Sequence, residues 1–304
     1  FNLFDEPNER KIHKKKTALL GGFFIFSTII SLFLYLIVFN FENIFFYDDL
    51  YLNSFFIPLA FVFFLGLYDD KYSLNAELKL FLIGILVILI LFFDNILILN
   101  KLYFSTLDYT INLGVFSIPF TVLCFLLFMN ALNMFDGINL QVGTYFFLVT
   151  IFLFLKSNFN LLILTIYFPM ILFLLLNFKG KSFLGDNGSL LLAYLISYLV
   201  IKTYNFEYSK LSIEEIFILM MVPGIDMFRL FIERIYNKKN PFKPDSKHIH
   251  HFFINRYNYK KAFLIIQSMI FLPIIISLFF LDFIGLLLGL IFYTIFLKLY
   301  NLNN

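Results

Sequence analysis

The sequence predicts an all-α protein that crosses a membrane many times. Of its 304 residues, 61% are hydrophobic and 14% are charged, whereas soluble domains average roughly half apolar and a quarter charged. The mean hydropathy of +0.87 comes from apolar runs along the whole chain, which excludes a soluble enzyme with one membrane anchor. The net charge of +3 is too small for a nucleic-acid-binding surface. The single cysteine, Cys124, excludes a disulfide framework and a thiolate zinc site.

The predicted spans follow from the length of the apolar runs. A helix needs about 20 mostly apolar residues to cross a bilayer, with ~17 as a lower limit. Runs of this kind, cut where polar or charged residues interrupt them, predict about ten spans. They cover residues 19–39, 52–68, 79–99, 114–132, 140–156, 160–178, 188–203, 213–235, 262–281 and 283–300. We therefore expect residues 1–304 to form one integral membrane domain.

The basic residues divide unevenly between the two sets of loops. One set holds only Lys101, Lys156, Lys202 and Lys210, which leaves nineteen of the 23 Lys and Arg residues to the other set. Because cytoplasmic loops are enriched in Lys and Arg, we expect the basic set to face the cytoplasm. That set includes the amino-terminal segment, the carboxy terminus and the loops near 66–80, 130–141, 179–190 and 236–261.

Two adjacent carboxylates, Asp69 and Asp70, close the second span. Such a pair repels unless a cation or a phosphate-bound metal lies between the two groups. The alternative is an ordinary turn with a helix-capping Asp. Lys79 opens the next helix and either faces the same loop or anchors the helix at the cytoplasmic interface.

Asn130, Asn133 and Asp136 follow one another at a spacing of three at the end of the fourth span. On a helix end, this spacing places polar groups along one side. Two amides and a carboxylate that emerge from an apolar span need partners, which a hydrophilic ligand or a metal provides. The alternative is a helix end capped through Asn and Gly137.

Asp186 stands between Gly185 and Gly188, where the seventh span begins. Glycines allow a phosphate to approach the backbone, a helix N-terminus favours anions, and a carboxylate among them suggests a bridging Mg²⁺. A plain N-cap by Asp186 is the alternative. The segment is not a P-loop, because the GK[ST] element is missing.

Asp226 lies inside the eighth span and is followed by Arg229, Glu233 and Arg234. Ionisable groups within a membrane either pair with one another as structural contacts or mark a functional site. The sequence leaves both interpretations open.

The last cytoplasmic loop contains His248, His250 and His251, close to Lys247 and Arg256. Three histidines within four positions next to basic residues indicate a phosphate-binding loop. A zinc site is disfavoured because no Cys accompanies the histidines and the other candidate ligands are hard oxygens, which suit Mg²⁺ or Mn²⁺. A basic patch for anionic lipid is a further alternative.

Together these motifs resemble those of the polyprenyl-phosphate N-acetylhexosamine-1-phosphate transferases, glycosyltransferase family 4, which start bacterial cell-wall and surface-glycan synthesis. The resemblance covers residues 5 to about 256 and has the family's order: DEPNERKIH and GG, Asp69-Asp70 with Lys79-Leu80, NALNMFDG, FLGDNGS, DMFRLFIERI and PFKPDSKHIHH. FLGDNGS and HIHH are more similar to the N-acetylglucosamine branch than to the muramoyl-pentapeptide branch.

The chain departs from the family's pattern at three places. Asn139 and Leu140 stand where the family's DGxDG motif has its second Asp and Gly, a departure that bears on any metal or nucleotide role there. Thr17-Ala18 stands where the family has Thr-Pro. Members usually have eleven spans, so a count of about ten suggests that the first helix is missing.

The resemblance implies a reaction at the cytoplasmic face of a bacterial inner membrane. A UDP-linked N-acetylhexosamine 1-phosphate, with N-acetylglucosamine as the expected sugar, passes to undecaprenyl phosphate and UMP is released. The product would begin O-antigen, teichoic acid or exopolysaccharide synthesis. The implied cofactor is Mg²⁺, or Mn²⁺ in its place, and the bundle is compatible with a homodimer among membrane lipids.

The resemblance also implies residue roles. Asp186 would bind the metal directly, with Asp69 and Asp70 beside the metal and the lipid phosphate, one of them as a candidate base. Asp136 would line the nucleotide pocket with Asn133 and Lys79. The remaining expected site residues are catalytic or phosphate-holding His248, His250 and His251 and substrate-binding Asn130, Lys247 and Arg256.

Three other functions compete with this one. A secondary transporter would place charges near the bilayer midplane and show inverted repeats, but the strong charges crowd one face and no convincing repeat is present. A non-catalytic membrane protein is disfavoured because the acidic and histidine motifs are retained. A phospho-N-acetylmuramoyl-pentapeptide transferase would differ only in its substrate.

Overall fold

The computed structural model of the chain describes residues 3–6, 16–39, 49–156, 160–206, 211–242, 245 and 247–301. Its helices are α1 (Gly21–Phe39), α2 (Asp49–Tyr72), α3 (Ala76–Phe93), α4 (Ser117–Phe135), α5 (Gln141–Lys156), α6 (Asn160–Phe178), α7 (Gly185–Phe206), α8 (Ile213–Tyr236), α9 (Ile249–Arg256), α10 (Tyr259–Phe279) and α11 (Asp282–Asn301). Its strands are β1 (Phe4–Asp5), β2 (Thr17–Leu19), β3 (Lys101–Phe104), β4 (Tyr109–Asn112) and β5 (Ser182–Phe183), and its 3₁₀ turns are η2 (Asn95–Leu97) and η3 (Gly114–Phe116).

Within these described ranges, each of the ten expected spans coincides with one long helix, and α9 is an additional short helix in the last loop. The predicted all-α polytopic class is thereby confirmed. By length and composition alone, six of the described helices are long and apolar enough to cross a membrane. They are Gly21–Phe39, Ala76–Phe93, Gly114–Phe135, Gly185–Phe206, Tyr259–Phe279 and Asp282–Asn301.

The third span was expected to continue to residue 99, but α3 ends at Phe93. The side chain of Asp94 accepts a hydrogen bond from the Ile96 N–H at 3.2 Å and so caps the η2 turn that follows. Hydropathy does not register this cap, because the residues after it are again apolar. The expected boundary was therefore wrong.

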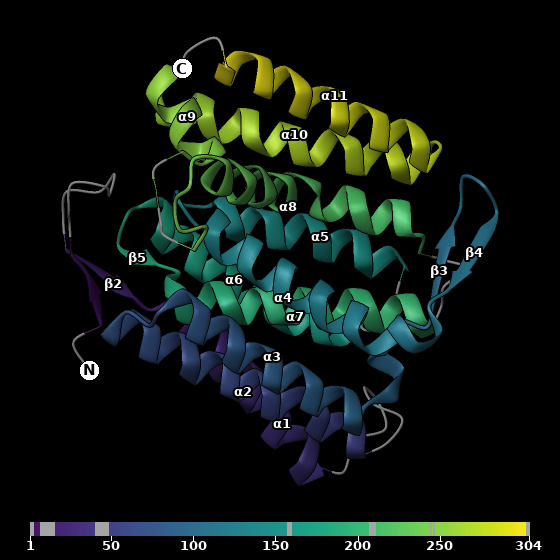
Figure 1. Cartoon of the computed structure of the whole chain (residues 1–304). Coiled ribbons are helices and arrows are strands. Elements are labelled where there is room, and N and C mark those ends of the chain that lie inside the picture. Colours follow the sequence, from purple (N-terminus) through teal and green to yellow (C-terminus); the bar gives the residue numbers. More distant parts are fainter. Residues whose placement is uncertain are drawn as a thin grey trace.

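The centre of the bundle is α7, against which α1, α2, α4 and α5 pack (Figure 1). Every residue of α7 from Asn187 to Tyr204 is buried. A helix that is buried all round belongs to the core rather than to the surface of a bundle. The first turn of α7, which contains Asp186, is therefore surrounded by other helices on several sides.

The two ends of the bundle carry different strands (Figure 1). At one end lie α9 and a small sheet in which β2 pairs antiparallel with β1 and parallel with β5. Ala18 of β2 lies opposite both Phe4 and Ser182. This sheet joins the amino-terminal segment to the segment that leads into α7. The antiparallel β3–β4 hairpin lies at the opposite end.

Buried ion pairs and hydrogen bonds stabilise the end of the bundle that carries the β3–β4 hairpin. Lys202 of α7 forms an ion pair with Asp94, and both side chains are almost fully buried. Glu214, at the start of α8, accepts hydrogen bonds from the Ser105 and Thr106 N–H groups, both at 3.1 Å. Glu215, the next residue, forms an ion pair with Lys156 at 2.6 Å. The Tyr204 hydroxyl donates to the Lys101 carbonyl at 3.0 Å. Three of the four basic residues of the minority loop set therefore gather at this end, namely Lys101, Lys156 and Lys202.

Candidate active site

Asp70 caps α7 from outside the helix. Its Oδ1 accepts a hydrogen bond from the Asp186 N–H at 2.7 Å, and its Oδ2 accepts from the Asn187 N–H at 3.0 Å and from the Asn187 side chain. Helix N-termini leave such N–H groups without partners inside the helix, and they attract negative charge. The preceding Gly185 has a φ of +74°, which glycine adopts without strain. Asp70 thus fixes the first turn of α7.

Asp69 points to a different partner. Its Oδ1 accepts from the Leu74 N–H at 2.7 Å, and its Oδ2 forms an ion pair with Lys79 Nζ at 2.6 Å. Lys79 also lies 3.3 Å from Asn133 Oδ1 and 3.8 Å from Asp186 Oδ2. One lysine at the start of α3 therefore serves two carboxylates that are far apart in the sequence.

Asn133 connects α4 to the same group. Its side-chain amide donates to Asp186 Oδ1 at 2.7 Å and to Ser189 Oγ at 2.8 Å. One turn later, Asp136 caps the end of α4. Burial, together with repulsion from Asp186, Asp70 and Asp5, raises the pKa of Asp136 to about 8. The structure thus brings together the ends of α2 and α4 and the beginnings of α3 and α7.

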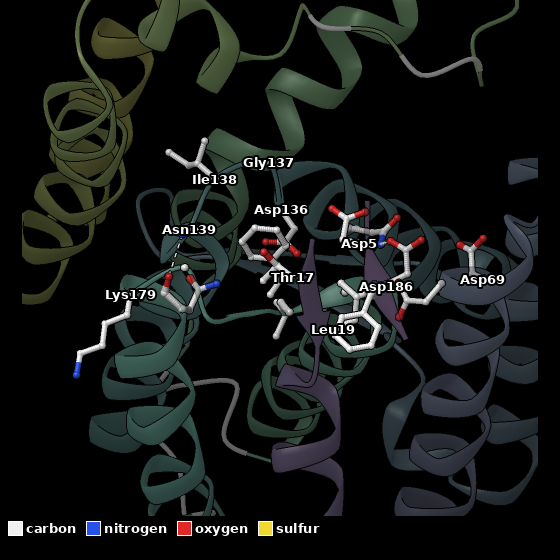
Figure 2. Close-up of a pocket in the computed structure, with 18 of the residues that line it drawn as sticks. Asp5, Thr17, Leu19, Asp69, Asp136, Gly137, Ile138, Asn139, Lys179 and Asp186 are labelled. Atoms are coloured by element: carbon white, nitrogen blue, oxygen red, sulfur yellow. Dashed lines mark hydrogen bonds between the residues drawn. The ribbon is translucent and has the colours of Figure 1, made fainter. Parts of the chain in front are cut away.

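These side chains border a cavity of about 820 Å³ at the sheet end of the bundle. Figure 2 shows Asp5 and Asp186 close together with Asp69 beyond them, Asp136 near the centre of the view beside Gly137, and Asn139 and Lys179 on the opposite side. The expected site residues that line the cavity are Asp69, Asp70, Asn133, Asp136, Asp186 and His251. Lys79 lies behind this lining, held by Asp69 and Asn133.

The histidine motif reaches the cavity through one ring. His251 lines the cavity, whereas His250 packs against Gly137 so closely that a Cβ on Gly137 would lie 2.0 Å from the ring Nε2. Burial and the neighbouring His248 and His251 lower the pKa of His250 to about 3. Burial and His248 also lower the pKa of His251. His248 faces Asp226 instead, with 3.0 Å between Nδ1 and Oδ2.

Besides Lys79, three expected substrate-binding residues do not line the described cavity. The Asn130 amide donates to the sulfur atoms of Met227 at 3.2 Å and Met134 at 3.5 Å. Lys247 forms an ion pair with Glu233. Arg256 is exposed at the end of α9, and its guanidinium lies 5.9 Å from the Tyr257 ring centre.

Asn139 and Leu140, which depart from the family's motif, are both hydrogen-bonded to Asn177 of α6. The Asn139 side chain donates to the Asn177 carbonyl at 2.9 Å, and the Leu140 N–H donates to Asn177 Oδ1 at 2.5 Å. Tyr259 of α10 donates to the Asn139 carbonyl at 3.1 Å. Leu140 has a φ of +70°, a region that favours glycine. An ionised Asp at position 139 could not donate to the Asn177 carbonyl. This hydrogen bond therefore gives a structural reason for Asn, rather than Asp, at position 139.

Sequence reasoning missed several cavity residues. Phe4, Asp5, Thr17 and Leu19 come from the small sheet, and Asn177, Lys179 and Tyr259 come from the ends of α6 and α10. Asp5 stands in the DEPNERKIH motif, which was the available signal for it. Residues 7–15 of that segment lie outside the described residues.

The donor chemistry of the cavity fits a hard divalent cation. Carboxylate oxygens are the ligands that Mg²⁺ prefers. Burial is the main cause of the raised pKa of Asp136, and repulsion from Asp186, Asp70 and Asp5, which a divalent cation would relieve, adds to it. Among the described residues, no three His, Cys, Asp or Glu side chains form a ready-made metal site. The magnesium site therefore stays a prediction.

A polytopic helical bundle with a polar cavity lined by carboxylates at one end has the architecture of a membrane-embedded enzyme. Residues 52–204 match the model of glycosyl transferase family 4. The chain belongs to this family, as its motifs predicted.

Curated relatives cover most of the chain. A protein of Bacillus subtilis named probable undecaprenyl-phosphate N-acetylglucosaminyl 1-phosphate transferase is 32% identical over 256 residues, which are 81% of this chain and 68% of the relative. Undecaprenyl-phosphate alpha-N-acetylglucosaminyl 1-phosphate transferases of Thermotoga maritima and Escherichia coli K12 are 32% and 26% identical. These matches cover 87% of this chain and 77% and 72% of the respective relatives.

Proposed function

We propose that this chain is a sugar-1-phosphate transferase that moves N-acetylglucosamine 1-phosphate from its UDP derivative to undecaprenyl phosphate and releases UMP. The observation that carries the proposal is the cavity in which Asp69, Asp70, Asn133, Asp136 and Asp186 meet. The names of the relatives supply the transferred group and the acceptor, and the UDP-linked donor follows from the motif resemblance. The expected location is the bacterial cytoplasmic membrane, with the cavity at the cytoplasmic face.

In the proposed reaction, an oxygen of the lipid phosphate attacks the sugar-bearing phosphorus of the nucleotide diphosphate. A new phosphorus–oxygen bond forms, the bond to the UMP oxygen breaks, and UMP leaves as an anion. Two anions must meet, so positioning and charge neutralisation contribute most of the rate. A base contributes little, because a phosphate oxygen is already mostly ionised near neutral pH.

Different side chains of the chain have different roles in this reaction. Lys79, fixed by Asp69 and Asn133, supplies positive charge next to Asp186. Asp70 accepts hydrogen bonds from the first N–H groups of α7 and so fixes the turn that carries Asp186. A bound Mg²⁺, held by Asp186 with Asp69 and Asp70 beside it, would neutralise phosphate oxygens. His251 faces the cavity and can donate to a phosphate of the departing nucleotide.

A lipid-labelling assay tests the proposal. The protein is purified in detergent and given undecaprenyl phosphate and radiolabelled UDP-N-acetylglucosamine, with and without Mg²⁺. The proposal expects label in the lipid phase that depends on Mg²⁺. If only the muramoyl-pentapeptide donor or only UDP-N-acetylgalactosamine gave lipid label, N-acetylglucosamine would be the wrong sugar and the active donor would identify the right one. No lipid label from any of these donors would contradict the transferase assignment.

A further inference from the structure

Asp226 of α8 organises the start of the histidine motif from outside the cavity. Its carboxylate is 2% exposed, and its Oδ1 accepts from Arg229 Nη2 at 2.7 Å. Its Oδ2 lies 3.0 Å from His248 Nδ1 and 3.3 Å from the Ile249 N–H. Arg229 also donates to the Lys247 carbonyl at 2.8 Å. One buried ion pair therefore holds three consecutive residues of the loop.

Arg229 is itself fixed by aromatic rings of α11. Its guanidinium lies 4.6 Å from the ring centre of Tyr300 and 5.4 Å from that of Phe296. Such contacts attract a guanidinium electrostatically and restrict its orientation. The Asp226–Arg229 pair is thus part of a set of side-chain contacts, called here the α8–α11 frame, that joins α8 to α11.

The rings of the histidine motif connect this frame to the cavity. The His248 and His250 rings are parallel to within 3°, with centres 5.5 Å apart. The centres of the His250 and His251 rings are 4.4 Å apart. His250 is wedged against Gly137, and His251 lines the cavity. A change in the orientation of His248 would therefore pass by contact to His251.

A carboxylate accepts hydrogen bonds and cannot donate them. The short contact between Asp226 Oδ2 and His248 Nδ1 therefore requires a proton on Nδ1. We propose that Asp226 is the positioning residue of the histidine motif: it holds His248 with a proton on Nδ1 and, through the His250 ring that lies between His248 and His251, sets the face that His251 presents to the substrate. This inference rests on the proposed transferase function.

A double-mutant cycle tests whether Asp226 acts through His248. We expect Asp226→Asn to lower kcat by about 10- to 100-fold, the range typical for loss of a carboxylate that orients a metal-bound histidine, with a smaller change in KM. Because the effect passes through one ring, the double variant Asp226→Asn/His248→Ala should be no slower than His248→Ala alone, within about two-fold. Losses that multiply would overturn the proposal.

Glu215→Gln is the matched control. Glu215 lies on the same helix, is 3% exposed and is paired with Lys156, but it stands at the hairpin end. This variant should lower the yield of folded protein while the folded fraction keeps the wild-type kcat. An equal loss of kcat would show that any buried charge lost from α8 slows the enzyme, which contradicts a specific role for Asp226.

A spectroscopic readout separates this inference from the proposed function. The chain has four histidines, so ¹⁵N-histidine labelling gives few signals, and the His248→Ala variant assigns the one of interest. We expect a proton on Nδ1 in the wild type and a shift of the His248 proton towards Nε2 in Asp226→Asn, whose amide can donate. An unchanged His248 signal would contradict the inference. Since this measurement needs no turnover, a wild-type chain that transfers no sugar would refute the proposed function alone.

Discussion

At the scale of single residues, the carboxylates of the cavity differ in the partners that the fold provides. Asp69 has the ammonium group of Lys79, and Asp70 has the N–H groups of α7. Asp136 is instead buried, and burial together with repulsion from three other carboxylates raises its pKa to about 8. The same residue type therefore has three different electrostatic roles within one cavity.

This environment predicts a pH dependence of stability that belongs to Asp136. Its pKa in the folded protein lies above the unfolded value of 3.8, so the folded state binds the proton more tightly. The stabilisation is complete below about pH 4 and is lost as the pH rises towards about 8. Asp136→Asn mimics the protonated acid, so its midpoint of thermal unfolding should fall less over this range than that of the wild type.

The measurement is thermal unfolding in detergent between about pH 4 and pH 8, the two pKa limits. Mg²⁺ should raise the wild-type midpoint most at the upper end of the range, where the carboxylates are ionised. Parallel pH curves for the wild type and Asp136→Asn would contradict the assigned environment of Asp136.

Sequence motifs pointed to polar residues that the structure brings to one cavity, because polar groups at the ends of apolar spans are conspicuous. Their individual roles were not predictable, since Asp69 and Asp70 are neighbours with different partners. Helix geometry explains why Asn130 lies away from the cavity that Asn133 and Asp136 line. A step of three residues falls about 60° short of a full helical turn, so two steps separate Asn130 from Asp136 by about 120°. Asn130 accordingly faces Met134 and Met227.

At the scale of elements, the long helices were predictable because the length of an apolar run requires no knowledge of its neighbours. The strands β1, β2 and β5 have two or three residues each, too few to show an alternating pattern. They form because segments distant in the sequence meet at the end of the bundle. The cavity residues of this sheet were therefore missed, although Asp5 stands in a motif.

A close approach of α2 to α7 should be sensitive to one methyl group. A Cβ on Gly66 would lie 2.4 Å from Asn187 Cα, whereas one on Gly84 of α3 would have its nearest neighbour at 3.7 Å. Gly66→Ala should push the first turn of α7 away from α2 and lower both stability and transfer. Gly84→Ala should raise the free energy of unfolding by roughly 0.5–1 kcal/mol and leave transfer unchanged. Thermal unfolding and the transfer assay on both variants test this contrast, and equal effects would refute it.

At the scale of the whole molecule, the described charges divide between two ends. One end contains the carboxylates, Lys79 and the histidine motif around the cavity. The other end contains the Lys202–Asp94 and Lys156–Glu215 pairs around the hairpin. This division predicts that stability at the hairpin end can be changed without changing the chemistry at the cavity.

Lys202→Met leaves the charge of Asp94 buried without its partner. The loss of one member of such a pair typically costs about 3–5 kcal/mol, whereas replacing both with apolar residues is far less harmful. We therefore expect Lys202→Met to be strongly destabilised and Lys202→Met/Asp94→Leu to recover part of the loss, because the double variant also loses the Asp94 cap on the Ile96 N–H. Chemical denaturation measures the stability, and kcat per folded molecule should match the wild type in both variants. A large loss of kcat in the folded fraction would contradict the separation of the two ends.

The central claim is that sugar phosphate transfer takes place in the cavity bordered by Asp186. The most direct test is the transfer of labelled N-acetylglucosamine 1-phosphate to undecaprenyl phosphate by the wild type, by Asp186→Asn and by Asp108→Asn, an exposed hairpin residue that serves as the control. Asp186→Asn removes charge with little change in volume, so it should fold normally and lose transfer by about 100-fold or more. Asp108→Asn should be as active as the wild type. Near-normal transfer by folded Asp186→Asn would contradict the assignment of this cavity as the active site.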